Sequence, residues 1–531
     1  MEPNKYQPKT GLDKDLKKIS HIESAVLTQG QSMARIGLGL LFLVGIWVFA
    51  TMQTGVGGIS PFVVGAAVIG GYMALNIGAN DVANNVGPAV GSKALTLMGA
   101  IIIAAIFESA GAIIAGGDVV STIKGGIIDP KFMPDAHTFM TAMMAALLAA
   151  ALWLNLATYA GAPVSTTHSI VGGVMGAGIA ATGFDAVNWS TMGQIAASWV
   201  ISPLMGGIIA AAFLYLLKVT VLNKEDKIAA ARTWVPIVVA IMAGAFTIYL
   251  MNKGIKHVYK SSWTEMFIAG GVMFGATWAL VRARIIARSK NLENRKKSVN
   301  KLFVIPLIFS AALLSFAHGA NDVANAVGPL AAIVSASETG QIVTKAGIPL
   351  WVMLVGALGI SIGLMLFGPK LIRTVGSEIT KLNPVRAFCV ALAAAITVII
   401  ASALGLPVSS THIAVGGVFG VGFLREYIAK RDGIKLSEKL AATRPSPLAA
   451  AEAAAHAGVQ TVESITPELG TDFEGMDAKE IKKAIKKSKK RKLVRRNHAW
   501  TIAAAWIITV PVAAVLAGVL FVLLMRLGIG A

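Results

Sequence analysis

Two short clusters of carboxylate and amide side chains lie inside apolar sequence, where such groups are costly to place. The clusters share one spacing and lie 241 residues apart: Asn80, Asp81 and Asn84, then Asn321, Asp322 and Asn325. On a helix, residues three or four positions apart share a face, so each cluster predicts a compact set of oxygen atoms. Such oxygens suit hard cations, and a membrane-buried Asp marks a functional site by default. Hydrogen bonding between helices is the alternative, but it does not require the same set twice.

The clusters belong to a duplicated stretch, GANDVANNVGP at 78–88 and GANDVANAVGP at 319–329. The two copies differ at one position, Asn85 against Ala326, where they need not bind alike. We expect Gly78, Gly87 and Pro88 to interrupt the helix and free backbone carbonyl groups.

A second duplicated stretch follows each copy, GAPVSTTHSIVGGVMGAG at 161–178 and GLPVSSTHIAVGGVFGVG at 405–422. Proline is tolerated in a first helical turn, so Pro163 and Pro407 predict two helix starts. Six hydroxyl residues would lie in those first turns: Ser165, Thr166, Thr167, Ser409, Ser410 and Thr411. Unpaired N–H groups and the helix dipole favour an anion there, so these residues predict an oxyanion site. Ordinary helix capping by Ser and Thr is the alternative.

An oxyanion beside Asp81 and Asp322 would meet two like charges. At 4 Å each repulsion is about 4 kcal/mol at an effective dielectric of 20. The duplicated stretches share no Lys or Arg, since the counterpart of Lys93 is Val334. The compensating charge must come from solution as metal cations or protons. A site that binds its anion well only together with cations is thermodynamically coupled, and moving it across a membrane gives symport.

Three further ionisable residues lie in apolar surroundings. Glu108, within IIIAAIFESAGAII, is a candidate coupling residue, with a partner-satisfied structural acid as the alternative. His168 and His412 follow the hydroxyl clusters in both copies. They could titrate near neutral pH, but we expect hydrogen bonds to a neighbouring helix instead.

Composition excludes a soluble globular protein. Hydrophobic residues make up 55% of the 531, charged residues only 14%, and the mean hydropathy is +0.69. We predict an all-α polytopic membrane protein with about ten to twelve transmembrane helices, some of them broken or re-entrant. The only cysteine, Cys389, excludes an internal disulfide. The net charge of +20 gathers beside membrane spans, which favours cytoplasmic loops in contact with lipid over nucleic-acid binding.

The basic segment Arg282–Lys301 and the segment Arg425–Arg496, which ends in the basic run Lys482–Arg496, also give a topology. With both in the cytoplasm, span counting places the N-terminus inside, starts copy one outside and starts copy two inside, which is an inverted-topology repeat. The polar N-terminal segment lacks a signal peptide's features, so the first apolar run is expected to be a retained span. The expected segments are 1–35 (cytoplasmic), 36–54 (first span), 55–190 (repeat 1), 191–282 (intervening spans), 283–301 (basic cytoplasmic loop), 302–425 (repeat 2), 426–498 (cytoplasmic low-complexity insertion) and 499–531 (last span).

At its duplicated stretches the chain resembles the inorganic phosphate transporter family. GANDVANNVGPAVG and HGANDVANAVGP look like the family's signature, and PVSTTH and PVSSTH look like its second motif. The resemblance implies an inverted-repeat transporter that moves inorganic phosphate with Na⁺ or H⁺. It suggests the six hydroxyl residues for phosphate, the two Asn/Asp clusters for cations and part of the phosphate environment, and Glu108 as a matching acid. Some members carry an acid in the helix before the second PVSSTH, but Asn383–Ser402 contains none here.

The sequence therefore predicts a phosphate symporter of the inner or plasma membrane that works by alternating access, with no enzymatic activity and no cofactor. The oxygen-rich clusters favour Na⁺ over H⁺, and Asp81 and Asp322 would be the Na⁺ ligands. A symporter of another oxyanion such as sulfate, an anion channel, and a receptor that uses residues 431–496 for a partner are the alternatives. The expected partners are phosphate, the cation and membrane lipids, and a homo-oligomer is left open.

Overall fold

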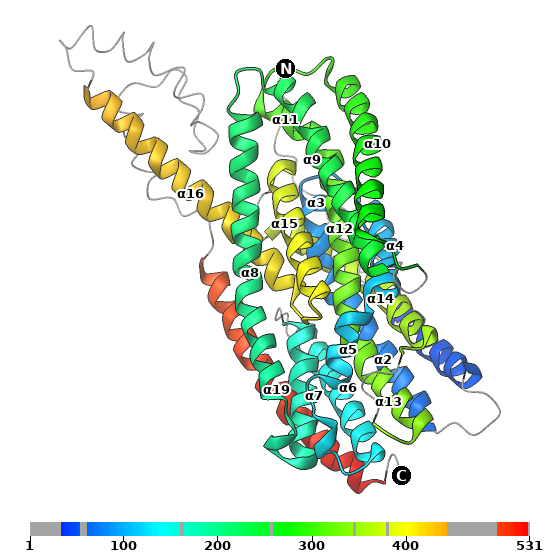
Figure 1. The fold of residues 1–531 in the computed structure, drawn as a ribbon. Helices are drawn as coiled ribbons and strands as arrows, with labels where there is room; N and C mark the ends of the chain where they lie inside the picture. The colour runs from blue at the N-terminus through cyan, green and yellow to red at the C-terminus, as the bar shows by residue number, and fades with distance from the viewer. Residues whose placement is uncertain are drawn as a thin grey trace, which may run out of the picture.

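The computed structural model is helical almost throughout (Figure 1). It describes residues 33–53, 61–159, 164–254, 259–342, 347–378, 382–442 and 496–528. Within those ranges the only β pairing is a single bridge between Ile128 and Val187. Eleven of the described helices are long and apolar enough to cross a membrane, beginning with Met33–Gln53. The prediction of an all-α polytopic membrane protein with ten to twelve spans is confirmed.

The helices of the first half include every element that carries its polar motifs. They are α2 (Pro61–Asn80), α3 (Val82–Gly91), α4 (Leu97–Ala115), α5 (Gly117–Gly125), α6 (Ala136–Tyr159), α7 (Thr166–Thr182) and α8 (Trp189–Leu217), which is followed by a π-helical turn (Lys218–Leu222). An intervening group follows: α9 (Lys227–Tyr249), a π-helical turn (Leu250–Gly254), α10 (Trp263–Ser289) and α11 (Lys296–Leu302). The second half comprises α12 (Val304–Asp322), α13 (Ala324–Thr339), α14 (Leu350–Glu378), α15 (Pro384–Ala403), α16 (Ser410–Ala442) and α19 (Arg496–Arg526).

The first-motif helices break at their carboxylates. Asp81 separates α2 from α3, and α12 ends at Asp322. Gly78 lies inside α2, and Gly87 and Pro88 lie inside α3, so the expected interruption falls near these residues, at Asp81, and not at any of them. Gly78 instead allows close packing, because a Cβ there would collide with the carbonyl oxygen of Ile360 on α14.

The second-motif helices begin within the hydroxyl clusters, three residues after the prolines that were expected to start them. Helix α7 starts at Thr166, and its N-cap Ser165 accepts a hydrogen bond from the His168 amide at 3.2 Å. Ser409 accepts from the His412 amide at 3.4 Å in the same way, before α16. Helix α16 continues beyond 425, where the repeat was expected to end. Residues 1–32 and 443–495, which hold most of the predicted terminal segment and insertion, lie outside the described residues.

The two halves interlock reciprocally. Helix α2 packs on α14, and its counterpart α12 packs on α4. Likewise α7 packs on α19, while its counterpart α16 packs on α8. Figure 1 shows α8 crossing α16 and α19 running beside α7. Each half therefore completes its bundle with helices of the other, as two copies related by a twofold axis do.

Two serines, one on α4 and one on α14, make a reciprocal contact between the two halves. Ser109 Oγ and Ser361 Oγ lie 2.7 Å apart. Ser361 Oγ also donates to the Ala105 carbonyl at 3.0 Å, and Ser109 Oγ to the Ala357 carbonyl at 3.4 Å. The same contact is thus made in both directions, which pairs Ser109 with Ser361 as equivalent positions.

Close contacts of two glycines give the same alignment of α4 with α14 as the two serines. A Cβ on Gly319 would collide with the carbonyl oxygen of Glu108, just as one on Gly78 would collide with that of Ile360. Because Gly78 and Gly319 are equivalent in the duplicated motif, Ile360 on α14 is the counterpart of Glu108 on α4. The acid of the first half is therefore replaced by an aliphatic residue in the second.

A lysine is among the side chains that tie the intervening helices to the repeats. Lys253 Nζ, in the turn after α9, donates to Asp118 Oδ2 on α5 at 2.8 Å. It also donates to the carbonyl of Ala403 at the end of α15 at 2.9 Å. This single side chain joins the α9–α10 hairpin to one helix from each half.

We expect Gly420→Ala to destabilise the protein by about 1–3 kcal/mol, because a Cβ on this residue of α16 would collide with the backbone of Gly207 on α8. Gly271→Ala is the matched control, since Gly271 is exposed on α10 and a Cβ there meets no atom within 4 Å. It should be neutral or stabilising by about 0.5–1 kcal/mol, because alanine favours helix. Thermal unfolding of the purified protein in detergent measures both. Equal shifts of the two melting temperatures would contradict tight α8–α16 packing.

Candidate functional site

The helix breaks of the first motif face the first turns of the second-motif helices. Thr166 Oγ1 donates to Asp81 Oδ2 at 2.7 Å. Ser410 Oγ donates to Asp322 Oδ2 at 3.2 Å. The two contacts are equivalent by the repeat, so each copy joins one hydroxyl to one carboxylate.

Other contacts cross between the copies and merge the two half-sites. Thr411 Oγ1 donates to Asp81 Oδ1 at 3.3 Å and accepts from Asn84 Nδ2 at 2.9 Å. On the opposite side, Asn325 Nδ2 lies 3.2 Å from Thr167 Oγ1. Both motifs of both copies therefore meet in one polar cluster, although they lie up to 330 residues apart in the sequence.

The remaining predicted residues support the carboxylates or cap the helices. Asn80 Nδ2 donates to Asp81 Oδ1 at 3.4 Å. Asn321 Nδ2 donates to Asp322 Oδ1 at 2.6 Å and to the Val408 carbonyl at 2.7 Å. Ser165 and Ser409 have the helix-capping role that was the alternative for the hydroxyl residues. Their Oγ atoms accept hydrogen bonds from backbone N–H groups.

Access to the cluster differs between the copies. Asp81 and Asp322 are buried, with exposures of 2% and 1%. Asn321 and Asn325 are fully buried as well, whereas their counterparts Asn80 and Asn84 are partly exposed, as is Thr411. The cluster therefore opens on the side of α3 and is closed on the side of α13.

His318 is a site residue that sequence reasoning missed. It lies one helical turn before Asp322, and its Nε2 is 2.6 Å from Asp322 Oδ2. One ligand atom from each of Asp81, His318 and Asp322 lies within 4.8 Å of the others, which is the spacing of a cation site. The available signal was the i, i+4 spacing from Asp322, but copy one has Ile77 at the equivalent position, so comparing the repeats did not reveal it.

Glu108 reaches the cluster through His318. Its Oε2 lies 2.5 Å from His318 Nδ1, and its Oε1 accepts from Asn85 Nδ2 at 2.8 Å. Both Glu108 and His318 are fully buried. A continuous chain of contacts thus runs from Asn85 through Glu108 and His318 to Asp322.

His168 does not form the hydrogen bond expected of it. Within the described residues neither of its ring nitrogens has a hydrogen-bond partner, although the side chain is only 2% exposed. Its ring packs against Trp199 on α8, with centroids 3.8 Å apart, and meets the His412 ring edge-on at 4.8 Å. The two copies therefore contact each other directly behind the hydroxyl residues.

The electrostatics of the cluster favour cations. No Lys or Arg among the described residues forms an ion pair with Asp81 or Asp322. Two full charges no more than 4.8 Å apart repel by at least about 3.5 kcal/mol at an effective dielectric of 20. A cation bound by these carboxylates and the neighbouring amide oxygens would remove that repulsion. The first turns of α7 and α16 then offer hydroxyl groups and backbone N–H groups to an anion.

Comparisons with known proteins agree with this geometry. The profile of the phosphate transporter family matches residues 77–517. A Helicobacter pylori protein named "Putative phosphate permease" is 49% identical over 96% of this chain and 98% of its own length. A Haemophilus influenzae protein of the same name is 41% identical over 68% of this chain and 87% of its own. A solved structure titled "The sodium-dependent phosphate transporter" is 31% identical, with a TM-score of 0.71, and the match covers 88% of this chain and all of that one. The chain belongs to the phosphate transporter family.

Proposed function

We propose that this protein imports inorganic phosphate by symport with Na⁺ through alternating access. Phosphate would bind the hydroxyl and backbone N–H groups at the starts of α7 and α16. Na⁺ would bind Asp81, Asp322 and the amide oxygens of the neighbouring asparagines.

The observation that carries this proposal is that the hydroxyl donors are already occupied by the carboxylates. Thr166 donates to Asp81 at 2.7 Å, and Ser410 donates to Asp322 at 3.2 Å. A cation on a carboxylate takes over its lone pairs and frees the hydroxyl to turn toward phosphate. The same cation offsets the repulsion between phosphate and the carboxylates. Cation and anion binding would thus assist each other, which is the coupling that symport requires.

The unequal access of the two copies supports alternating access. The cluster is partly exposed beside Asn80 and Asn84 on the α3 side and buried beside Asn321 and Asn325 on the α13 side. The repeat relates these two sides, so exchanging their conformations would open the cluster in the opposite direction. With the basic loop at 283–301 in the cytoplasm, the more open side faces the cytoplasm.

Na⁺ is favoured over H⁺ by two observations. The cluster supplies several carboxylate and amide oxygens within one small volume, which suits a hard metal ion. The structural relative that covers 88% of this chain is titled a sodium-dependent phosphate transporter.

Phosphate uptake into proteoliposomes tests the proposal. We expect radiolabelled phosphate to accumulate against its gradient when Na⁺ is imposed outside at equal pH, and not under a pH gradient alone. Accumulation driven only by the pH gradient would show that the coupling ion is H⁺ and not Na⁺. Uptake that never exceeds equilibrium would indicate a channel, and strong competition by sulfate would indicate a broader oxyanion carrier.

A further inference from the structure

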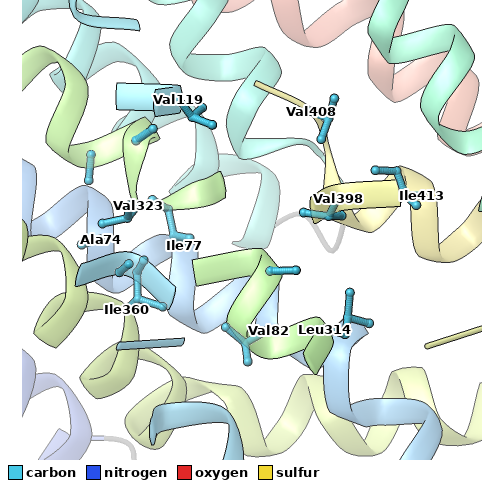
Figure 2. Close-up of a cluster of buried hydrophobic side chains, with 14 of the residues drawn as sticks. Ala74, Ile77, Val82, Val119, Leu314, Val323, Ile360, Val398, Val408 and Ile413 are labelled. Atoms are coloured by element: carbon cyan, nitrogen blue, oxygen red, sulfur yellow. The ribbon is translucent and has the colours of Figure 1, made fainter. Parts of the chain in front are cut away.

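The two carboxylates of the duplicated motif have different surroundings. Asp322 contacts His318, which contacts Glu108, which accepts from Asn85. The equivalent positions around Asp81 are apolar: Ile77, Ile360 and Ala326 stand where copy two's carboxylate has His318, Glu108 and Asn85. All three are buried in the hydrophobic core. Figure 2 shows Ile77 and Ile360 within one cluster of buried aliphatic side chains.

The network adds no net charge to the Asp322 half-site. His318 Nδ1 forms a hydrogen bond with Glu108, whereas His318 Nε2 makes a close contact with Asp322 that lacks hydrogen-bond geometry. A protonated His318 would offset one of the two carboxylates, so the sum over Glu108, His318 and Asp322 would be one negative charge. Asp322 with its network therefore carries the same charge as Asp81 would alone. What differs between the half-sites is how firmly the carboxylate is held.

Asp322 is held by its own helix and by a neighbour. Asn321 and His318 both lie on α12, at 2.6 Å from the carboxylate, and His318 is braced in turn by Glu108 on α4. For Asp81 the shortest contact instead comes from α7, through Thr166 at 2.7 Å, and its own helix offers only Asn80 at 3.4 Å. Asp322 receives only a 3.2 Å contact from α16, through Ser410. A movement of α7 and α16 would therefore break the shortest contact of Asp81 but leave the two shortest contacts of Asp322 in place.

We propose that Asn85, Glu108 and His318 are positioning residues that fix Asp322 for cation binding, which makes the two half-sites unequal. The Asp322 half-site is pre-formed and binds its cation more tightly. The Asp81 half-site forms only when α7 and α16 close around phosphate. This inference rests on the proposed function, because it assigns an order to the two half-sites of the same transport site.

Four single variants test the network. Asn85→Ala removes the donor to Glu108 and installs the residue that copy two has, and Glu108→Gln weakens the brace on His318. Asn85→Ser retains a donor and is the conservative rescue. Ile360→Val is the matched control, because it alters the counterpart of Glu108 on the side that has no polar network.

Two measurements separate positioning from a general loss of structure. The first is the half-saturating Na⁺ concentration for phosphate uptake, compared with the phosphate KM at saturating Na⁺. The second is the rise in melting temperature that Na⁺ alone gives the purified full-length protein. We expect Asn85→Ala and Glu108→Gln to raise the half-saturating Na⁺ concentration about tenfold, the equivalent of one hydrogen bond of ~1.4 kcal/mol. The phosphate KM should stay within about twofold, because saturating Na⁺ refills the weakened half-site. Na⁺ should also stabilise both variants less.

Other outcomes would overturn the inference. An unchanged half-saturating Na⁺ concentration in both variants, or an equal rise in Ile360→Val, would show that the network does not act on the cation. A rise in the phosphate KM alone would place the network on the anion instead. Absence of Na⁺-driven uptake by the unchanged protein would reject the proposed function itself, and this inference with it.

Discussion

Phosphate uptake driven by a Na⁺ gradient should fall at least about 100-fold when Asp81 is replaced by asparagine. The substitution keeps the shape of the side chain and removes its charge. Asp81 is 2% exposed, and its carboxylate accepts from Thr166, Thr411 and Asn80. A cation placed there would lose its charged ligand, and removing one partner of a buried charge pair costs about 3–5 kcal/mol. Tenfold in binding corresponds to about 1.4 kcal/mol, so 100-fold is the lower end of the expected loss.

Asp81→Asn should act on the cation before the anion. We expect Na⁺ to promote phosphate binding to the purified variant less than in the unchanged protein, while Na⁺ alone still stabilises the variant through the Asp322 half-site. Asp185→Asn is the control, because Asp185 is an exposed residue in the turn before α8. The amount of protein in the membrane must be equal for both variants. Na⁺-driven uptake at the unchanged rate in Asp81→Asn would remove this carboxylate from the coupling site.

The same change at Asp322 should have an additional consequence. His318 Nε2 would then lie 2.6 Å from an amide group instead of a carboxylate, and the charge balance of the Glu108–His318 pair would be disturbed. We expect Asp322→Asn to abolish coupled uptake as well, but with a larger loss of thermal stability than Asp81→Asn. The contrast follows directly from the apolar surroundings of Ile77 and Ile360 in the other half.

The sequence was sufficient for the architecture because its strongest signals are local. The apolar runs, the duplicated motifs and the basic loops each lie within one stretch of chain, and they predicted the all-α fold, the number of spans and the inverted repeat. The starts of α7 and α16 followed from Pro and hydroxyl residues for the same reason. The break after α2 was assigned to the wrong residues because a glycine in a helix can serve close packing as well as interruption. Gly78, beside Ile360, serves packing.

The contacts within the site could not be predicted from local sequence signals, because they join segments that are far apart in the sequence. The hydroxyl of Thr411 bonds to Asp81 of the other copy, and this pairing depends on how the repeats interlock. The counterpart of Glu108 was also hidden, because α4 and α14 share no motif and are aligned only by their glycine contacts. The lack of an acid in Asn383–Ser402 therefore concerns α15, whereas the position equivalent to Glu108 is Ile360 on α14.

Removing the hydroxyl of Thr166 should have the opposite signature to removing the Asp81 charge. Thr166→Val keeps the volume of the side chain and deletes the donor that contacts Asp81 at 2.7 Å. If that hydroxyl turns to phosphate when Na⁺ binds, the variant loses one hydrogen bond to a charged ligand, about 1.5–3 kcal/mol. We expect the phosphate KM to rise about 10- to 100-fold. Thr166→Ser retains the donor and should stay near the unchanged protein.

The Na⁺ dependence of Thr166→Val distinguishes this mechanism from simple damage to the site. In the absence of phosphate the hydroxyl competes with the cation for Asp81, so its removal should leave Na⁺ binding unchanged or tighten it. Na⁺ would then stabilise the purified variant at least as well as the unchanged protein, while phosphate added on top of Na⁺ would stabilise it less. Parallel weakening of Na⁺ and phosphate binding would show instead that Thr166 only holds Asp81 in place. The exchange of a hydroxyl between carboxylate and phosphate would then not be the coupling step.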